Sequence, residues 1–233
     1  IRDFCLSRGL GDVYKRQGLN WCLHGFTKPV SNWCERVLRE QGGLTAEPIY
    51  NKVKDFALEF YSDGQGEVRF AGYSVFSTNE HGAYTGNLLA SDGQIEESIA
   101  CCLSLEKLTG IREALRAELA SIYGNTYTGY LGVDMMVCRS DKENGYRVHP
   151  CVEINMRMNM GVVARLFYDR FVAPGSKGCF AVEYVPDNET LRARHEQDMH
   201  DYPLTVEQGR LASGYLPLVP VTGKSCYRAY VRI

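Results

Sequence analysis

The sequence has 233 residues, of which 45% are hydrophobic and 23% are charged, and its formal net charge is -2. This length and balance are typical of a soluble globular protein, and they exclude disordered, collagen-like and coiled-coil chains. The mild acidity argues against nucleic-acid binding as the main role. No apolar run approaches the ~18 residues that cross a bilayer, and no signal peptide is recognisable. The nine cysteines are scattered without a C-x-x-C pair, which favours reduced thiols over disulfides or zinc. We therefore expect a cytoplasmic protein that binds neither membrane nor nucleic acid.

The first seventeen residues differ in character from those that follow. Residues 7–17, SRGLGDVYKRQ, resemble the translation of a transposase-based sequencing adapter. We therefore expect residues 1–17 to be a non-native leader that contacts nothing else, with the native part starting at about Gly18.

The first half of the chain shows the following pattern of elements. Apolar spacing predicts a helix over 28–41, ended by Gly42 and Gly43, and a short strand over 44–50. Residues 55–62 and 67–78 read as strands joined by a turn at 63–66, and 83–90 as a further extended segment. Residues 95–123 read as helical, in two pieces broken near Thr109 and Gly110.

The second half alternates strands with shorter helices. Strands are expected over 130–138 and 147–155, joined by a two-residue turn at Asn144 and Gly145. A helix over 161–171, a strand over 179–185 and a polar helix over 189–200 come next, and short strands and a few helices follow. The pattern predicts an α+β fold with antiparallel strand pairs.

The hairpin formed by residues 130–155 gathers polar side chains on one face. A two-residue turn places Asp134 opposite Asn155, and a slip of two residues places it opposite Glu153. In either register Asp134, Glu153, Asn155 and Arg157 share a face, because opposite residues share a face and the strand period is two. The intervening Val133, Met135, Val152 and Ile154 should then face a core.

Two neighbouring carboxylates repel each other unless a cation lies between them. Mg²⁺ prefers carboxylate and amide oxygens together with substrate phosphates, so Asp134, Glu153 and Asn155 are candidate metal ligands. Their side-chain oxygens should then converge on one point. Arg157 is placed to meet phosphate oxygens, which makes it the candidate catalytic residue. The alternative is an ordinary solvated strand face, on which the same residue types are common.

These residues resemble a motif of the ATP-grasp superfamily, in which an Asp on one strand precedes Glu-x-Asn-x-Arg on the next. GYLGVD, ending at Asp134, and VEINMR, containing Glu153, Asn155 and Arg157, match that pattern. The resemblance implies that these side chains hold the magnesium ions that bridge ATP phosphates. It also implies the ATP-grasp fold, with two α+β lobes built on antiparallel sheets, of which the first is incomplete here.

A second segment, AEPIY followed by KDFAL, resembles the hinge between the two lobes of that family, where adenine docks. The resemblance implies that Glu47 and the Pro48 carbonyl meet the adenine amino group, that the Tyr50 N–H meets a ring nitrogen, and that Ile49 belongs to the same nucleotide-binding segment. It places Asp55 near the ribose. The implied cofactors are ATP and Mg²⁺.

The resemblance extends over roughly residues 18–171 and departs from the family in one respect. The glycine-rich loop and lysines that precede the hinge in the family are not recognisable here. We therefore expect residues 18–172 to be an ATP-grasp core with its hinge near 46–55, and 173–233 to be a truncated C-terminal α+β extension. This fragment is expected to be inactive.

The implied function is that of an ATP-dependent carboxylate–amine ligase. Such an enzyme activates a carboxylate as an acyl phosphate, which an amine or another nucleophile then attacks. Small-molecule carboxylates and amines are the implied partners, and the sequence does not specify an oligomeric state. The alternatives are a kinase-like phosphotransferase and a non-catalytic nucleotide-binding protein.

Overall fold

The structure is a computed structural model in which residues 4–7, 20–22, 26–48, 50–79, 83–140 and 145–233 are described. It divides into two compact units, Ile1–Asn51 and Lys52–Ile233. The division falls between Asn51 and Lys52, inside the range 46–55 predicted for the hinge.

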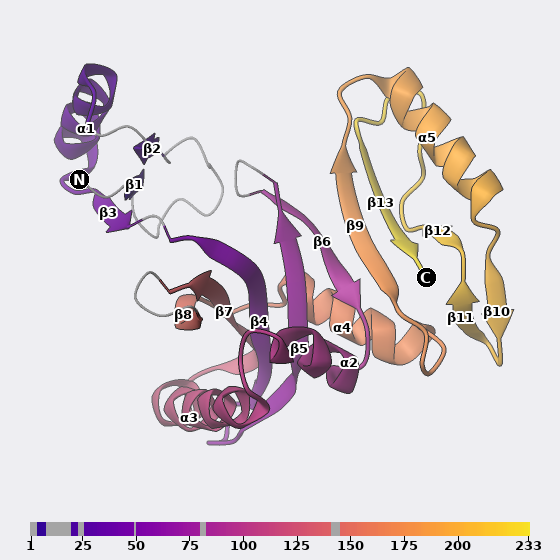
Figure 1. The fold of residues 1–233 in the computed structure, drawn as a ribbon, viewed down its shortest axis with the longest axis horizontal. Coiled ribbons are helices and arrows are strands. Elements are labelled where there is room, and N and C mark those ends of the chain that lie inside the picture. Colours follow the sequence, from indigo (N-terminus) through magenta and orange to yellow (C-terminus); the bar gives the residue numbers. More distant parts are fainter. Residues whose placement is uncertain (1–3, 8–19, 23–25, 49, 80–82, 141–144) are drawn as a thin grey trace. The chain divides into compact units, whose positions relative to one another are not determined.

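The first unit combines one helix with a small antiparallel sheet (Figure 1). The strands β1 (Phe4–Ser7), β2 (Asn20–Cys22) and β3 (Thr45–Pro48) lie in the order β2-β1-β3. Helix α1 (Lys28–Gln41) carries Pro in its first turn and ends at Gly42, whose φ of 77° lies in the left-handed region that glycine adopts easily. The prediction for 28–41 is therefore confirmed.

Part of the expected leader contacts the rest of the first unit. Phe4–Ser7 pairs antiparallel with β3, from Phe4 opposite Pro48 to Ser7 opposite Thr45. The expectation that residues 1–17 contact nothing is therefore wrong for residues 4–7, because this strand supplies backbone partners to β2 and β3. Residues 1–3 and 8–17 lie outside the described residues, and the adapter origin stays a prediction.

The second unit is built on an eight-stranded antiparallel sheet with strand order β12-β13-β9-β6-β5-β4-β7-β8. Its strands are β4 (Lys52–Asp63), β5 (Val68–Thr78), β6 (Tyr84–Leu89), β7 (Thr128–Arg139), β8 (Tyr146–Asn155), β9 (Gly178–Tyr184), β12 (Tyr215–Pro217) and β13 (Tyr227–Arg232). Strands β10 (Thr205–Glu207) and β11 (Arg210–Ser213) form a separate hairpin. The helices are α2 (Asp92–Ala100), α3 (Leu105–Tyr123), α4 (Met160–Phe171) and α5 (Asn188–Asp201).

The chain does not divide at 172–173, where a C-terminal extension was expected to begin. Strand β9 pairs with β6 on one side and with β13 on the other, so β9, β12 and β13 continue the sheet of β4–β8. Backbone hydrogen bonds that run across a proposed boundary argue against a separate domain. Every residue from 202 to 233 is described, and this stretch contains four short strands and no helix, whereas a few helices were expected.

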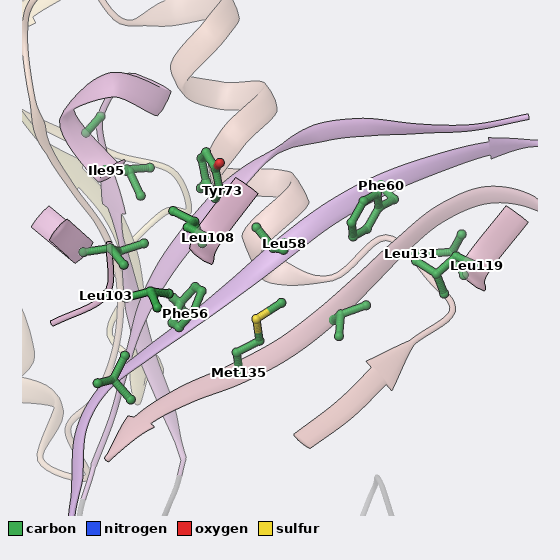
Figure 2. Packing of buried hydrophobic residues seen from close by; sticks show 14 of the residues in the cluster. Phe56, Leu58, Phe60, Tyr73, Ile95, Leu103, Leu108, Leu119, Leu131 and Met135 are labelled. Carbon is green, nitrogen blue, oxygen red and sulfur yellow. The ribbon is translucent and has the colours of Figure 1, made fainter. Parts of the chain in front are cut away.

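One face of the sheet carries the main hydrophobic core (Figure 2). Alternate residues of β4, namely Phe56, Leu58 and Phe60, are fully buried there. They pack with β7 residues such as Met135 and with Ile95 of α2 and Leu108 of α3. Burying each such side chain contributes roughly 1.5–3 kcal/mol, so this face fixes the sheet to α2 and α3.

The opposite face of the sheet is covered in part by α4. Leu89 of β6, Phe180 of β9 and Val231 of β13 pack against Ala164 and Tyr168 of this helix. Nearer the centre of the sheet the same face turns polar, with Glu59 of β4 and Ser74 of β5 both buried. This polar half contains the candidate site.

The break between α2 and α3 lies at residues 101–104, not near Gly110 as expected. Ser91 and Gln94 form a capping box that starts α2 at Asp92, and Ser104 caps α3. Gly110 lies inside α3 with open space where a side chain would be. The N-caps therefore set the residues at which α2 and α3 begin. Gly110 does not interrupt α3, because one exposed glycine destabilises a helix by only about 1 kcal/mol.

The hairpin of β7 and β8 forms as predicted, and Asp134 pairs as in the second of the two expected registers. Arg139 lies opposite Tyr146, so the connection is longer than the expected two-residue turn. A bulge between Asp134 and Met136 then shifts the register and places Asp134 opposite Glu153.

The opposite face of this hairpin is only partly buried, although all four of its apolar residues were expected to face a core. Val133 and Met135 are buried as predicted, whereas Val152 and Ile154 are 47% and 38% exposed. Strand β8 is the edge of the sheet, beyond the area that α2 and α3 cover. Within the described residues, no helix is long and apolar enough to cross a membrane.

Candidate functional site

Two carboxylates from neighbouring strands form the centre of the candidate site. Asp134 of β7 lies directly opposite Glu153 of β8, which places both side chains on the face that α4 partly covers. Burial, together with the nearby charge of Glu153, raises the pKa of Asp134 to about 6. The pair therefore repels when both groups are ionised, and a bound cation would relieve that repulsion.

Asn155 and Arg157 continue the site beyond the end of β8. Asn155 is buried, and its Nδ2 donates a hydrogen bond of 3.2 Å to Asp134 Oδ2. Its Oδ1 accepts a hydrogen bond of 3.0 Å from the guanidinium of the exposed Arg157. The four predicted residues thus come together, linked in the order Glu153, Asp134, Asn155 and Arg157.

The side-chain oxygens of Asp134, Glu153 and Asn155 were predicted to converge on one point, and the structure agrees only in part. Asp134 and Glu153 face each other, but the amide oxygen of Asn155 is directed at Arg157. Turning the Asn155 amide by half a rotation would present its oxygen to the carboxylate pair, since the two ends of an amide differ only in donor and acceptor. With that rotation the two carboxylates and the amide fit the preference of Mg²⁺ for a few protein oxygens.

The part of the chain that the structure describes contains no group of three or more His, Cys, Asp or Glu side chains placed to hold a metal. The Asp134–Glu153 pair has only two such residues, so water or substrate phosphate oxygens would have to complete the coordination of a metal.

The predicted nucleotide residues are distributed over the two units. Glu47 and Pro48 lie in β3, Tyr50 follows with 44% of its surface exposed, and Ile49 lies outside the described residues. These positions belong to the first unit. The adenine site therefore stays a prediction from the sequence.

Asp55, the residue expected near the ribose, lies on β4 in the second unit. Its carboxylate forms an ion pair with Lys52, and Lys52 Nζ also donates to Thr78 Oγ1 at 3.3 Å. Asp55 lies opposite Met136 on β7, on the same face as Asp134, and its charge contributes to raising the pKa of Asp134. Asp55 is therefore part of the same acidic face as the carboxylate pair.

A buried carboxylic acid that the sequence analysis missed lies behind this site. Glu59 of β4 is 1% exposed, and Asn159 Nδ2 donates to its Oε2 at 2.9 Å. Its Oε1 has no hydrogen-bond partner in the described structure. Burial raises the pKa of Glu59 to about 8, and the charge of Asp134 contributes. Glu59 is therefore mostly protonated at neutral pH.

Two glycines make room for this acid. A Cβ on Gly132 would lie 2.6 Å from Glu59 Oε2, and a Cβ on Gly161 would lie 2.2 Å from Glu59 Oε1 and 2.6 Å from Ser74 Oγ. Such contacts are too short for any larger residue without displacement. Ser74 Oγ in turn accepts from Asn87 Nδ2, so polar groups extend from Glu59 across β5 to β6.

No protein-family model matches the sequence, and no curated protein matches it significantly. Solved structures match it at the level of the fold. The N5-carboxyaminoimidazole synthetase of Staphylococcus aureus complexed with ADP aligns with 98% of this chain at a TM-score of 0.55 and 12% identity. The biotin carboxylase domain of the Hydrogenobacter thermophilus 2-oxoglutarate carboxylase aligns with all of the chain at a TM-score of 0.53 and 11% identity.

A third match is the N5-carboxyaminoimidazole synthase of Aspergillus clavatus in complex with ADP and an aminoimidazole ribonucleotide. It aligns with 98% of this chain at a TM-score of 0.54 and 12% identity. The chain spans 57%, 53% and 56% of the lengths of these three structures. At this identity the similarity concerns architecture alone, and the architecture is the α+β ATP-grasp fold.

Proposed function

We propose that the protein is an ATP-dependent ligase of the ATP-grasp type, which activates a carboxylate as an acyl phosphate for attack by an amine or another nucleophile. The observation that carries this proposal is the cross-strand pair of Asp134 and Glu153, linked through Asn155 to Arg157. Paired carboxylates beside an amide and a guanidinium suit a magnesium-bound phosphate group.

Each residue of the site has a role in this proposal. Mg²⁺ would be held by Asp134, Glu153 and the rotated amide of Asn155. Its charge would neutralise that of the phosphate groups. Arg157 would bring a guanidinium to the oxygens of the transferred phosphoryl group. In the unrotated state the guanidinium donates to Asn155 Oδ1, which holds Arg157 beside the metal ligands, and rotation of the amide toward a metal would release Arg157 for the phosphate.

The nucleotide would be bound by residues at the hinge. Glu47 and the backbone of Pro48, Ile49 and Tyr50 would recognise adenine, and Asp55 would meet the ribose hydroxyls. Proline at position 48 is compatible with this role, because only its carbonyl is needed. The ion pair of Asp55 with Lys52 restrains its carboxylate on the acidic face of the sheet.

The fold neighbours support small-molecule substrates. Structures of this architecture are described in complex with ADP, with magnesium ADP and bicarbonate, and with an aminoimidazole ribonucleotide. A carboxylate or bicarbonate as acyl donor and an amine as acceptor are consistent with these ligands. We further propose a cytoplasmic location.

Product analysis tests the proposal. The protein is incubated with ATP and a panel of carboxylates and amines. Formation of ADP, phosphate and a new amide would establish ligase activity. ADP with a phosphorylated hydroxyl would favour the kinase-like alternative. The third outcome concerns a protein that includes a glycine-rich loop. If it binds nucleotide with magnesium but shows no turnover, a non-catalytic nucleotide-binding protein is favoured.

A further inference from the structure

Two adjacent cysteines with facing thiols lie in the link between α2 and α3. Cys101 Sγ and Cys102 Sγ are 3.1 Å apart, Cys101 is exposed and Cys102 is half-buried. Side chains of neighbouring residues usually diverge, so a pair whose sulfur atoms meet is a specific geometry. Nothing in the proposed ligase function uses this pair.

The surrounding contacts hold the pair in place. The backbone N–H groups of Cys102 and Leu103 both donate to the carbonyl of Ile99, at 2.9 and 3.0 Å. Leu103 is buried in the main core, and the Cys101 thiol donates to the carbonyl of Ser98 at 3.4 Å. The two sulfur atoms are therefore pre-organised before any ligand arrives.

The separation of the sulfur atoms indicates which chemistry suits them. A disulfide requires an S–S distance of about 2.05 Å, more than 1 Å shorter than that observed. Closing that gap would pull on a backbone that Ile99 and the buried Leu103 restrain. Burial and the neighbouring Cys101 thiol also raise the pKa of Cys102, which reduces the thiolate that oxidation needs.

A bridging atom fits the gap without such movement. If both sulfur atoms bound one centre at about 2.3 Å, the usual zinc–thiolate distance, the S–centre–S angle would be about 85°. That angle is narrower than the tetrahedral value of about 109° that structural zinc adopts. It suits a pyramidal, three-coordinate centre, which needs only two sulfur atoms from the protein.

We propose that Cys101 and Cys102 form a dithiol site that chelates a trivalent, thiophilic metalloid such as an organic arsenic(III) group. An arsenoxide, R–As=O, reacts with the two thiols to form two S–As bonds. The two S–H bonds break, the As=O oxygen leaves as water with both protons, and arsenic stays trivalent. No oxidant or reductant is needed, and the site is independent of the proposed ligase function.

The test uses the reduced chain and phenylarsine oxide as the probe. Intact mass should show one phenylarsenic group that survives excess 2-mercaptoethanol and is released by dithiothreitol, because a two-sulfur chelate outcompetes a single thiol. Cys101→Ser and Cys102→Ser should each abolish the resistant adduct. The matched control Cys151→Ser, which removes another exposed cysteine, should retain it.

Two further measurements make the result specific to the folded site. The native chain should hold the probe at least about tenfold more tightly than a peptide of residues 98–105, because the fold has already oriented both thiols. In the unmutated chain the probe should protect Cys101 and Cys102 from iodoacetamide and leave Cys151 reactive, a readout that needs no variant.

Three outcomes would overturn the proposal. A resistant adduct that persists in both single serine variants would place the chelate elsewhere. Equal affinity of the peptide and the native chain would show that the fold adds nothing. Conversion of the pair to a disulfide by hydrogen peroxide, before a stoichiometric arsenical binds, would identify an oxidation site instead.

Discussion

Asn159 joins the start of α4 to the middle of β4. Its Nδ2 donates to Glu59 Oε2 at 2.9 Å, while its Oδ1 accepts from the backbone N–H of Val162 at 2.9 Å and so caps the helix. At the other end of the short connection, Asn155 is bound to Asp134. The segment that carries Arg157 is therefore fixed at both ends, and Glu59 supports one of them.

The first prediction concerns the proton of Glu59. Its pKa is raised by burial from an ordinary value of 4.5 to about 8, so the folded state holds a proton that the unfolded chain releases. Stability from this group is fully present below pH 4.5 and is lost as the pH rises to about 8. Glu59→Gln cannot ionise and should not show this loss. Urea unfolding at pH 5 and pH 8.5 should show the variant gaining about 3–4 kcal/mol relative to the wild type.

Glu118→Gln provides the control for this measurement, because Glu118 is exposed on α3. Its unfolding free energy should follow that of the wild type at both pH values. If the difference between Glu59→Gln and the wild type does not change with pH, Glu59 is not protonated in the fold.

The second prediction concerns the space beside Glu59. A Cβ on Gly161 would lie 2.2 Å from Glu59 Oε1, so Gly161→Ala should destabilise the fold by about 1–3 kcal/mol through overpacking. Glu59→Ala removes the closest atom, so the double variant should be more stable than the sum of the single effects. A double-mutant cycle of unfolding free energies measures this coupling. Additive effects would show that the alanine is accommodated by moving α4 instead.

The third prediction concerns magnesium and pH. Burial and Glu153 raise the pKa of Asp134 from 3.8 to about 6, so without metal its contribution to stability is lost between these values as the pH rises. Magnesium needs the ionised form and should add about 1.4 kcal/mol at ten times its Kd. Thermal unfolding with and without magnesium should show this gain at pH 7.5 and not at pH 5.

Glu153→Gln separates this metal site from general salt effects. It changes little volume, so the fold should persist while the magnesium-dependent gain disappears, and the same variant should strongly lower turnover in any active form of the enzyme. The matched control is Glu189→Gln, an exposed carboxylate on α5. An equal magnesium effect in both variants would rule out the Asp134–Glu153 pair as the site.

Strand alternation predicted the faces of the β7–β8 hairpin, whereas it left its register open between two alternatives. The period of two placed Asp134, Glu153 and Asn155 on one face whichever register formed, and the structure agrees. The bulge after Asp134 could not be read from the sequence, because Asn144 and Gly145 suggested a tight turn. The exposure of Val152 and Ile154 depends on β8 being an edge strand, which is a property of the whole sheet.

Glu59 shows what a sequence reading overlooks. It lies in β4 between Leu58 and Phe60, where a charged residue on the second face looks like a solvated position. Its burial depends on α4, which is 100 positions further along the chain and provides Asn159. The alternation of Phe56, Leu58 and Phe60 with Ala57 and Glu59 is the pattern of one covered and one open face, so it carries no signal that Glu59 is buried.

The last prediction is that the chain binds magnesium ADP but does not turn ATP over. In the proposed function Asp55 and the Asp134–Glu153 pair would contact the ribose and the metal, whereas no glycine-rich loop or associated lysine is recognisable ahead of the hinge in this sequence. Those groups would supply positive charge and donors at the β- and γ-phosphates, where transfer occurs. Calorimetry should therefore detect magnesium-dependent ADP binding, weakened up to about tenfold in Asp55→Ala, which corresponds to one lost hydrogen bond to a charged group. Glu118→Gln should bind as the wild type does. ADP release at about 1 s⁻¹ with any carboxylate and amine would contradict the prediction, because the described site would then contain everything that phosphoryl transfer needs.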